Sequence, residues 1–309
     1  MAPGPKKLVL NKLKLGIVDS SAGNGHMFSF SSLFNGYEVS ELQKCPFPVI
    51  ANYLPKHATP VAVLREKAEI SAVWMRDSEY AEKVARFGKI ETVFKNLDLL
   101  IESVDGIIIT NDEPVGRESV LDRCLTSGKM IFLDKMIART PEELSNQLLK
   151  QCYPGQLYCA SSMSFSKALK GISWSSNTKK IVFSSPKNWA NYGIHVVDAF
   201  LAFAASNTLD YQIGALIHDE KISERQLSVF SKQFGKNGQI FLRTEGTAVA
   251  NFSITIWNDE GPREIIISDP FETFADMLST WLSRDPITAH LSEYKRYAEA
   301  VMILGSDQN

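Results

Sequence analysis

The sequence predicts a two-domain α/β protein, with a parallel sheet in its first half and an open, mainly antiparallel sheet in its second half. Up to about residue 160, runs rich in Val and Ile alternate with amphipathic segments of helical period, which is the pattern of βαβ units. After that point, strand-like runs follow one another with few helices between them, as in antiparallel sheets. The length of 309 residues agrees with two hydrophobic cores.

The strands and helices of the first half are predicted from the residues that flank them. Strands bounded by charges, glycine or proline are predicted at 13–19, 70–75, 106–110, 129–133 and 156–160. Helical patterns occupy 78–87, 93–101, 117–127 and 141–152. The last helix has the clearest start, because Thr140 suits the N-cap, Pro141 the first helical position and Glu143 a capping box. Residues 38–59 are too long for a loop inside a βαβ unit and are predicted to be an insertion.

The second half changes its period. Strands are predicted at 179–184, 210–217, 239–245, 248–257 and 263–268, and helices at 194–205, 270–283 and 286–304. A linker near 161–178 separates the two predicted domains, 1–160 and 161–309.

The composition argues against a nucleic-acid-binding, a membrane-spanning or a metal-binding protein. The chain has 33 Lys plus Arg against 35 Asp plus Glu, a net charge of −2, so no basic surface for nucleic acid is predicted. No charge-free apolar stretch approaches the roughly 18 residues that a membrane span needs. The four cysteines include no CxxC pair, which predicts reduced thiols, a cytoplasmic protein and no metal site.

Small residues follow the first predicted strand, where a dinucleotide-binding domain needs a tight turn before a helix. A full G-x-G-x-x-G pattern is missing from LGIVDSSAGNGHMFSF. The candidate cofactor-binding residues here are Ser20, Ser21, Gly23, Asn24, Gly25 and His26. The alternative is an ordinary glycine-rich turn.

The end of the second strand carries Arg76 and Asp77, where an acidic residue usually receives the ribose hydroxyls. If Arg76 contacts a 2′-phosphate, NADP is favoured, whereas an Asp77 contact with the ribose favours NAD. In the alternative interpretation, Asp77 only caps the following helix.

Polar residues also end two later strands, the position at which an open α/β sheet binds its ligand. Thr110, Asn111 and Asp112 end one strand, while Asp134 and Lys135 end the next. Further candidate cofactor-binding residues are therefore Thr110, Asn111, Asp134 and Lys135. Lys135 can reach a substrate oxygen from there, or it is an ordinary surface lysine.

The segment NWANYGIHVVDAF, residues 188–200, holds the candidate histidine of the second half. His195 is either an acid/base residue or a core histidine, because apolar residues surround it in sequence. Asp198 either pairs with the imidazole or faces solvent. The candidate sugar-pocket residues are Asn188, Trp189, Tyr192 and Lys167, each of which packing would also explain.

Three passages resemble the Gfo/Idh/MocA family of sugar and cyclitol dehydrogenases. They are GIIITNDEPVGRESVLDRCLTSGKMIFLDKMIARTPEEL, VWMRDSEYAEKVARFGKIETVFKN and ANYGIHVVDAF. In that family one strand ends in Thr-Pro and the next in Glu-Lys-Pro, before a helix that opens with Thr-x-Glu-Glu. The match here runs through Thr110, Asp134, Lys135 and residues 140–144.

The resemblance implies an N-terminal Rossmann domain and an α+β substrate domain that also forms oligomers, either dimers or tetramers. It implies an oxidoreductase that moves a hydride between NAD or NADP and a ring hydroxyl or ketone of a sugar, amino-sugar or cyclitol. Lys135 would hydrogen-bond the reacting hydroxyl, and His195 would act as general acid/base, since its ordinary pKa lies near neutrality.

The chain also departs from the family pattern. Asn191 stands where the family usually has Asp, four residues before the histidine, and an amide cannot take a proton. Asn191 is therefore predicted to orient the substrate or His195. Asn111 and Met136 replace two prolines, and the glycine pattern is degraded. These departures support a second hypothesis, a non-catalytic dinucleotide- or sugar-binding sensor or accessory protein with the same fold.

Overall fold

The computed structural model describes residues 12–175, 177–219, 224–231, 233, 238–246, 251–267 and 270–305. The chain divides into two compact units, residues 1–108 and 109–309, here called the first and second units. The division falls inside strand β4 (Gly106–Thr110). The predicted boundary near residue 160 separates the two sheets, whereas the division at residue 108 separates the two compact units. The boundary near residue 160 therefore stays a prediction.

The first sheet has the strand order β3-β2-β1-β4-β5-β6, which is that of doubly wound dinucleotide-binding folds. The pairs β1–β2, β2–β3 and β5–β6 are parallel. All five residues of β4 are buried, as a strand covered on both faces requires. The other strands are β1 (Leu13–Ser20), β2 (Ala68–Trp74), β3 (Thr92–Val93), β5 (Met130–Leu133) and β6 (Leu157–Cys159). The predicted Rossmann fold class is confirmed.

The helices of the first unit agree with the predicted pattern except near residue 93. That helix begins later, because Thr92–Val93 is strand β3 and the Asn96 side chain caps the helix by accepting from Asp98 N–H. The helices are α1 (His26–Asn35), α3 (Ala62–Arg65), α4 (Ser78–Phe87) and α5 (Leu97–Ser103).

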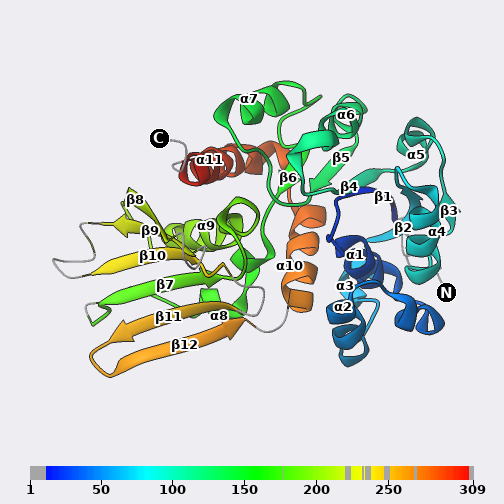
Figure 1. Cartoon of the computed structure of the whole chain (residues 1–309). Coiled ribbons are helices and arrows are strands. Elements are labelled where there is room, and N and C mark those ends of the chain that lie inside the picture. Colours follow the sequence, from blue (N-terminus) through cyan, green and yellow to red (C-terminus); the bar gives the residue numbers. More distant parts are fainter. Residues whose placement is uncertain are drawn as a thin grey trace, which may run out of the picture. The chain divides into compact units, whose positions relative to one another are not determined.

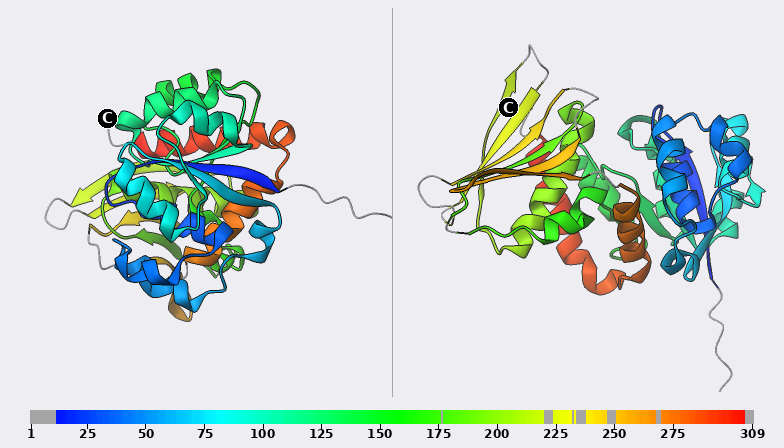
Figure 2. Two further views of the ribbon diagram at one scale, coloured as in Figure 1. Left: turned by 90° about the vertical axis from the view of Figure 1, so that its right-hand side faces the viewer. Right: turned by 90° about the horizontal axis from the view of Figure 1, so that it is seen from below.

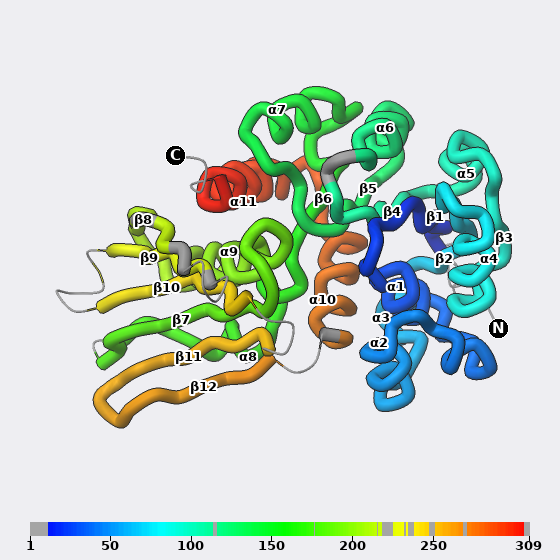
Figure 3. The backbone as a smooth tube through the Cα atoms, in the orientation of Figure 1, coloured from blue at the N-terminus to red at the C-terminus, as the bar shows by residue number. Residues whose placement is uncertain are grey.

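The predicted insertion at 38–59 has structure of its own. It consists of a 3₁₀ helix (Val39–Lys44), helix α2 (Pro48–Tyr53) and a 3₁₀ turn (Leu54–Lys56), which follow α1 and precede α3 in the sequence, and of which α2 is labelled in Figure 3. Ile50 and Leu54 are buried, and Tyr53 Oη is hydrogen-bonded to Ser29 Oγ of α1. The insertion therefore packs on α1, the helix that follows the predicted cofactor turn.

The second unit contains a six-stranded sheet of order β12-β11-β7-β10-β9-β8, seen from two sides in Figures 1 and 2. Only the β10–β7 pair among its described pairs is parallel, so the predicted open, mainly antiparallel sheet is confirmed. Its strands are β7 (Lys180–Ser185), β8 (Gln212–Asp219), β9 (Glu224–Phe230), β10 (Gln239–Thr244), β11 (Phe252–Asn258) and β12 (Gly261–Ile267). Predicted strand residues 248–250 and 268 lie outside the described residues.

Helix α9 (Trp189–Ser206) covers one face of this sheet and forms its core (Figure 1). Phe183 of β7 packs edge-on against Phe200 and Phe203 of α9. The remaining helical elements are α6 (Pro114–Leu125), α7 (Pro141–Leu149), a 3₁₀ turn (Ser162–Phe165), α8 (Lys167–Lys170), α10 (Pro270–Ser283) and α11 (Pro286–Gly305). Among the described helices, none is long and apolar enough to cross a membrane.

Candidate active site

The turn between β1 and α1 combines two residues of positive φ with the start of a helix, although it lacks the full glycine pattern. Asp19, the last residue but one of β1, has φ 55°, and Gly23 has φ 78°. A side chain built on Gly23 would meet nothing within 4 Å, so that side of the turn is open. The Asn24 side chain accepts from His26 N–H at 2.9 Å, where α1 begins. Ser21 and Asn24 are almost completely buried.

Gly25 is tightly enclosed by the insertion. A Cβ on Gly25 would lie 2.6 Å from Ile50 Cδ1 and 2.9 Å from the Phe47 ring. A glycine is therefore required here for close packing.

We expect Gly25→Ala to lower the free energy of unfolding by about 1–3 kcal/mol, the usual cost of overpacking a core. Chemical denaturation of the variant and the wild type measures it. Gly171→Ala is the control, since Gly171 has φ −88° and a Cβ there would meet only the Ala168 carbonyl oxygen, at an ordinary contact distance of 3.7 Å. Equal stability of Gly25→Ala and wild type would contradict the predicted packing.

Arg76 and Asp77 have separate partners in the first unit. The Asp77 side chain accepts from Glu79 and Tyr80 N–H, so Asp77 caps helix α4, and a contact with the ribose stays a prediction. The Arg76 guanidinium is paired with the Asp19 carboxylate at 3.2 Å, and the Asp19 side chain is 1% exposed while Arg76 is half exposed. Thus Arg76 neutralises the carboxylate that stands at the start of the turn.

These features fit an anionic dinucleotide. A positive-φ glycine, an open turn and a helix N-terminus are the backbone elements that hold a pyrophosphate. The departure is Asp19, whose negative charge would oppose a pyrophosphate if Arg76 did not balance it. The residues that would hold the cofactor in this unit are Ser20, Ser21, Gly23, Asn24, Gly25, His26 and Arg76.

The second unit brings together the residues predicted at the ends of β4 and β5. Lys135 Nζ donates to Asp112 Oδ2 at 2.9 Å, and Lys135 is only 7% exposed. Asp134 is buried and accepts from Lys135 N–H. Thr110 and Asn111 are buried as well. The surface-lysine alternative for Lys135 is therefore wrong.

The charge of Lys135 is set by opposing effects. Burial lowers its pKa, but the carboxylates of Asp134 and Asp112 raise it by more, and the net pKa lies above the ordinary value. Lys135 thus remains an ammonium group at neutral pH and can donate a hydrogen bond to a substrate oxygen.

His195 of α9 lies in a buried polar network. Its Nδ1 is hydrogen-bonded to Ser161 Oγ at 2.7 Å, and its ring is 6% exposed. Asp198 accepts from Ser161 N–H at 2.7 Å and pairs with Arg296 at 3.0 Å. Asp198 is 3% exposed, so the solvent-facing alternative is wrong, and its carboxylate reaches His195 through Ser161.

The ring of Tyr192 lies near both chemical candidates. Lys135 Nζ is 5.4 Å from the centroid of the Tyr192 ring, and the His195 ring centroid is 5.3 Å away on the same helix. Lys187 Nζ donates to the Tyr192 hydroxyl. Lys135, Tyr192 and His195 therefore form one cluster within the second unit.

The other predicted pocket residues are placed differently. Trp189 is 3% exposed inside the core of the second unit, against the position of Gly193, which favours the packing alternative. Lys167 is exposed and paired with Glu272. Asn191 lies exposed in the first turn of α9, where the Asn188 side chain accepts from its backbone N–H.

Sequence reasoning missed three residues that hold this site. Arg117, fully buried in α6, donates to the carbonyls of Met136 and Ile137. Ser161 and Arg296 complete the His195 network. Ser161 directly follows the β6 strand region, so its strand-end position is a signal that would have identified it, whereas Arg117 and Arg296 lie within helices and had none.

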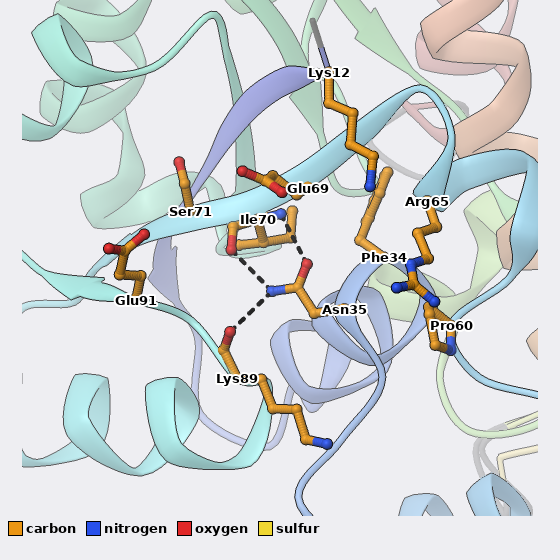
Figure 4. Close-up of a pocket in the computed structure, with 10 residues that line it drawn as sticks. All are labelled: Lys12, Phe34, Asn35, Pro60, Arg65, Glu69, Ile70, Ser71, Lys89 and Glu91. Atoms are coloured by element: carbon orange, nitrogen blue, oxygen red, sulfur yellow. Dashed lines mark hydrogen bonds between the residues drawn. The ribbon is translucent and has the colours of Figure 1, made fainter.

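A separate cavity of about 470 Å³ opens in the first unit at the start of β2 (Figure 4). Its Asn35 amide is bound to the backbone of Ile70 and Lys89 and so serves the fold. Ligands of open α/β sheets bind at the carboxyl ends of strands, which is the opposite end of β2. The chemistry is therefore not assigned to this cavity.

Comparison with known proteins agrees with the geometry. Residues 50–152 match the family model described as an oxidoreductase family with an NAD-binding Rossmann fold, GFO_IDH_MocA. Residues 50–152 are therefore similar to the Rossmann domain of that family. This match confirms the family resemblance that the strand-end motifs predicted. No curated protein sequence matches the chain.

Solved structures of dehydrogenases extend the likeness over nearly the whole chain. The myo-inositol dehydrogenase of Lactobacillus casei, solved with NAD(H) and myo-inositol, has a TM-score of 0.62 at 13% identity and covers 96% of this chain and 93% of its own. The UDP-N-acetylglucosamine 3-dehydrogenase of Acidithiobacillus ferrooxidans has a TM-score of 0.58 at 10% identity, covering 96% of each chain. A dehydrogenase of Clostridium difficile has a TM-score of 0.62 at 14% identity and covers 97% of this chain and 99% of its own. At such identities the likeness establishes the fold.

Proposed function

We propose that the protein is an NAD(P)-dependent dehydrogenase of a sugar, amino-sugar or cyclitol. The observation that carries this proposal is the cluster of Lys135, Tyr192 and His195, in which a buried ammonium and an imidazole both lie within 5.4 Å of the centre of one aromatic ring. Its solved neighbours include enzymes that act on myo-inositol and on UDP-N-acetylglucosamine, both of which carry ring hydroxyls.

Lys135 and His195 would have different roles in the oxidation of a ring carbinol. The Lys135 ammonium donates to the reacting oxygen and stabilises negative charge on it. His195 takes the hydroxyl proton, and since Nδ1 is engaged with Ser161, that transfer would use Nε2. A bound nicotinamide supplies the hydride acceptor, so the products are a ketone, a reduced cofactor and one proton. Asn191 and Tyr192 would contact the sugar from α9.

The proposal is tested by incubating the purified protein with NAD or NADP and a panel containing myo-inositol, scyllo-inositol and UDP-N-acetylglucosamine. We expect reduced nicotinamide to accumulate with one panel member at least. Micromolar cofactor binding without turnover of any member would favour the second candidate, a non-catalytic binding protein. That candidate is supported by Asn191 and by the substituted glycine turn.

Arg76 is predicted to favour NADP. Its guanidinium is half exposed at the end of β2, whereas Asp77 is committed to the α4 cap. We expect wild type to bind NADPH more tightly than NADH, and Arg76→Ala to weaken NADPH binding about tenfold with a smaller effect on NADH. Nicotinamide fluorescence titration measures both. Equal losses for the two cofactors would show that Arg76 does not distinguish them.

Association and location are part of the same proposal. The open sheet of the second unit exposes apolar side chains on Ile217, Phe230 and Ile266. Such a face favours a homo-oligomer, either a dimer or a tetramer. A cytoplasmic location and the absence of a nucleic-acid partner stay predictions from composition.

A further inference from the structure

We propose that Asp112 is the positioning residue of the site, holding Lys135 protonated and aimed at the substrate oxygen. This inference rests on the proposed function for its catalytic meaning. It begins from the 2.9 Å contact between Lys135 Nζ and Asp112 Oδ2.

The ion pair of Lys135 and Asp112 joins two loops, and Arg117 of α6 is hydrogen-bonded to the backbone of both. Arg117 donates to the carbonyls of Met136 and Ile137, directly after Lys135, and to Asn111, directly before Asp112. Because Arg117 is fully buried, both loops are fastened to the same helix. The separation of Lys135 from Asp112 is therefore defined by the backbone as well as by the ion pair.

Both side chains of the Lys135–Asp112 pair are largely shielded from solvent. The Asp112 side chain is 22% exposed and the Lys135 side chain 8%. A buried ammonium without a carboxylate would lose its proton readily, since burial penalises the charged form. The charged or titratable groups that face Lys135 are Asp134, the residue before it, Asp112 from the β4–α6 loop, and Tyr192 from α9.

Asp134 raises the pKa of Lys135 through its charge, as Asp112 does, but the contacts of the two carboxylates differ. Its Oδ1 accepts the backbone N–H of Lys135, so it shapes the backbone at that residue. Asp112 is the carboxylate that contacts the ammonium itself. At position 191, the α9 residue is an exposed amide that cannot carry negative charge. The geometry thus assigns the charge-balancing task to a loop residue rather than to α9.

The first test reads the protonation of Lys135 without any substrate. Trace labelling with acetic anhydride across pH, followed by peptide mass spectrometry, gives the fraction of Lys135 present as free amine. Asp112→Asn removes the charge at constant size and is expected to lower the pKa of Lys135. Its labelling rate near neutral pH then rises about tenfold for each pKa unit.

Two variants make the result specific. Asp112→Glu restores a carboxylate and is expected to bring labelling back toward the wild-type rate. Asp122→Asn is the matched control, because Asp122 lies in α6 and forms an exposed ion pair with another lysine, Lys150. An unchanged labelling profile of Lys135 in Asp112→Asn, or an equal change in Asp122→Asn, would overturn the proposal.

The second test concerns turnover. A panel member that is oxidised should show a basic limb in its pH–rate profile, since activity is lost as Lys135 deprotonates. Asp112→Asn should move this limb to lower pH, and Asp112→Glu should move it back. An unmoved limb contradicts the positioning role. If no panel member is oxidised, the proposed function fails while the labelling experiment still decides the Asp112 assignment.

Discussion

Lys135→Ala is expected to lower turnover by roughly a hundredfold or more, the scale on which acid/base and oxyanion-stabilising groups act. The reason is local: the variant deletes the ammonium that is held at 2.9 Å from Asp112 and beside the Tyr192 ring. Because this group acts on the reacting oxygen, the loss should appear in kcat as well as in kcat/KM. Steady-state kinetics with the substrate found in the panel measures both.

The control for this loss is another paired lysine. Lys150 forms an ion pair with Asp122 on the protein surface, and Lys150→Ala should leave turnover at the wild-type value. His195→Ala should also lose roughly a hundredfold, since it removes the proton acceptor. Wild-type turnover in both Lys135→Ala and His195→Ala would eliminate the assignment of either residue to the chemistry.

The sequence predicted the residues at the strand ends better than the hydrogen bonds and ion pairs that hold Lys135 and His195 in place. Lys135 follows a strand in a βαβ pattern, and this position alone indicates where an open α/β sheet binds its ligand. The partners of Lys135 and His195 lie far from them in sequence, since Asp112 contacts Lys135 and Ser161 contacts His195. A periodicity of two or 3.6 residues carries no information on such pairs, so only the folded chain identifies them.

The same limit applies to the fold. Strand β9 (Glu224–Phe230) was missed, because its polar residues lack the Val/Ile content that marked the other strands. It is a strand because it pairs with β8 and β10 on either side. Helix α9 starts earlier than its apolar pattern, because Asn188 caps it before the first buried turn.

Arg296→Met is expected to lower the free energy of unfolding by about 3–5 kcal/mol, the usual cost of leaving one partner of a buried ion pair uncompensated. The Asp198 side chain is 5% exposed and the Arg296 side chain 21% exposed, at 3.0 Å from each other. Arg296 also donates to the Cys159 carbonyl at 2.6 Å. Loss of the Arg296 guanidinium removes the cation that is paired with the buried Asp198 carboxylate. The Ser161 N–H and the Ser164 hydroxyl would still donate to that carboxylate.

A double-mutant cycle separates the charge from the packing. Asp198→Asn alone leaves the Arg296 guanidinium without its carboxylate, whereas the double variant Asp198→Asn with Arg296→Met has no unbalanced charge in the network. The double variant should therefore lose less stability than the sum of the two single losses. Urea denaturation of the four proteins at one pH measures the cycle. Strictly additive losses would mean that Arg296 stabilises the protein by packing and by its bond to Cys159, and that Asp198 holds Ser161 and His195 in place without its help.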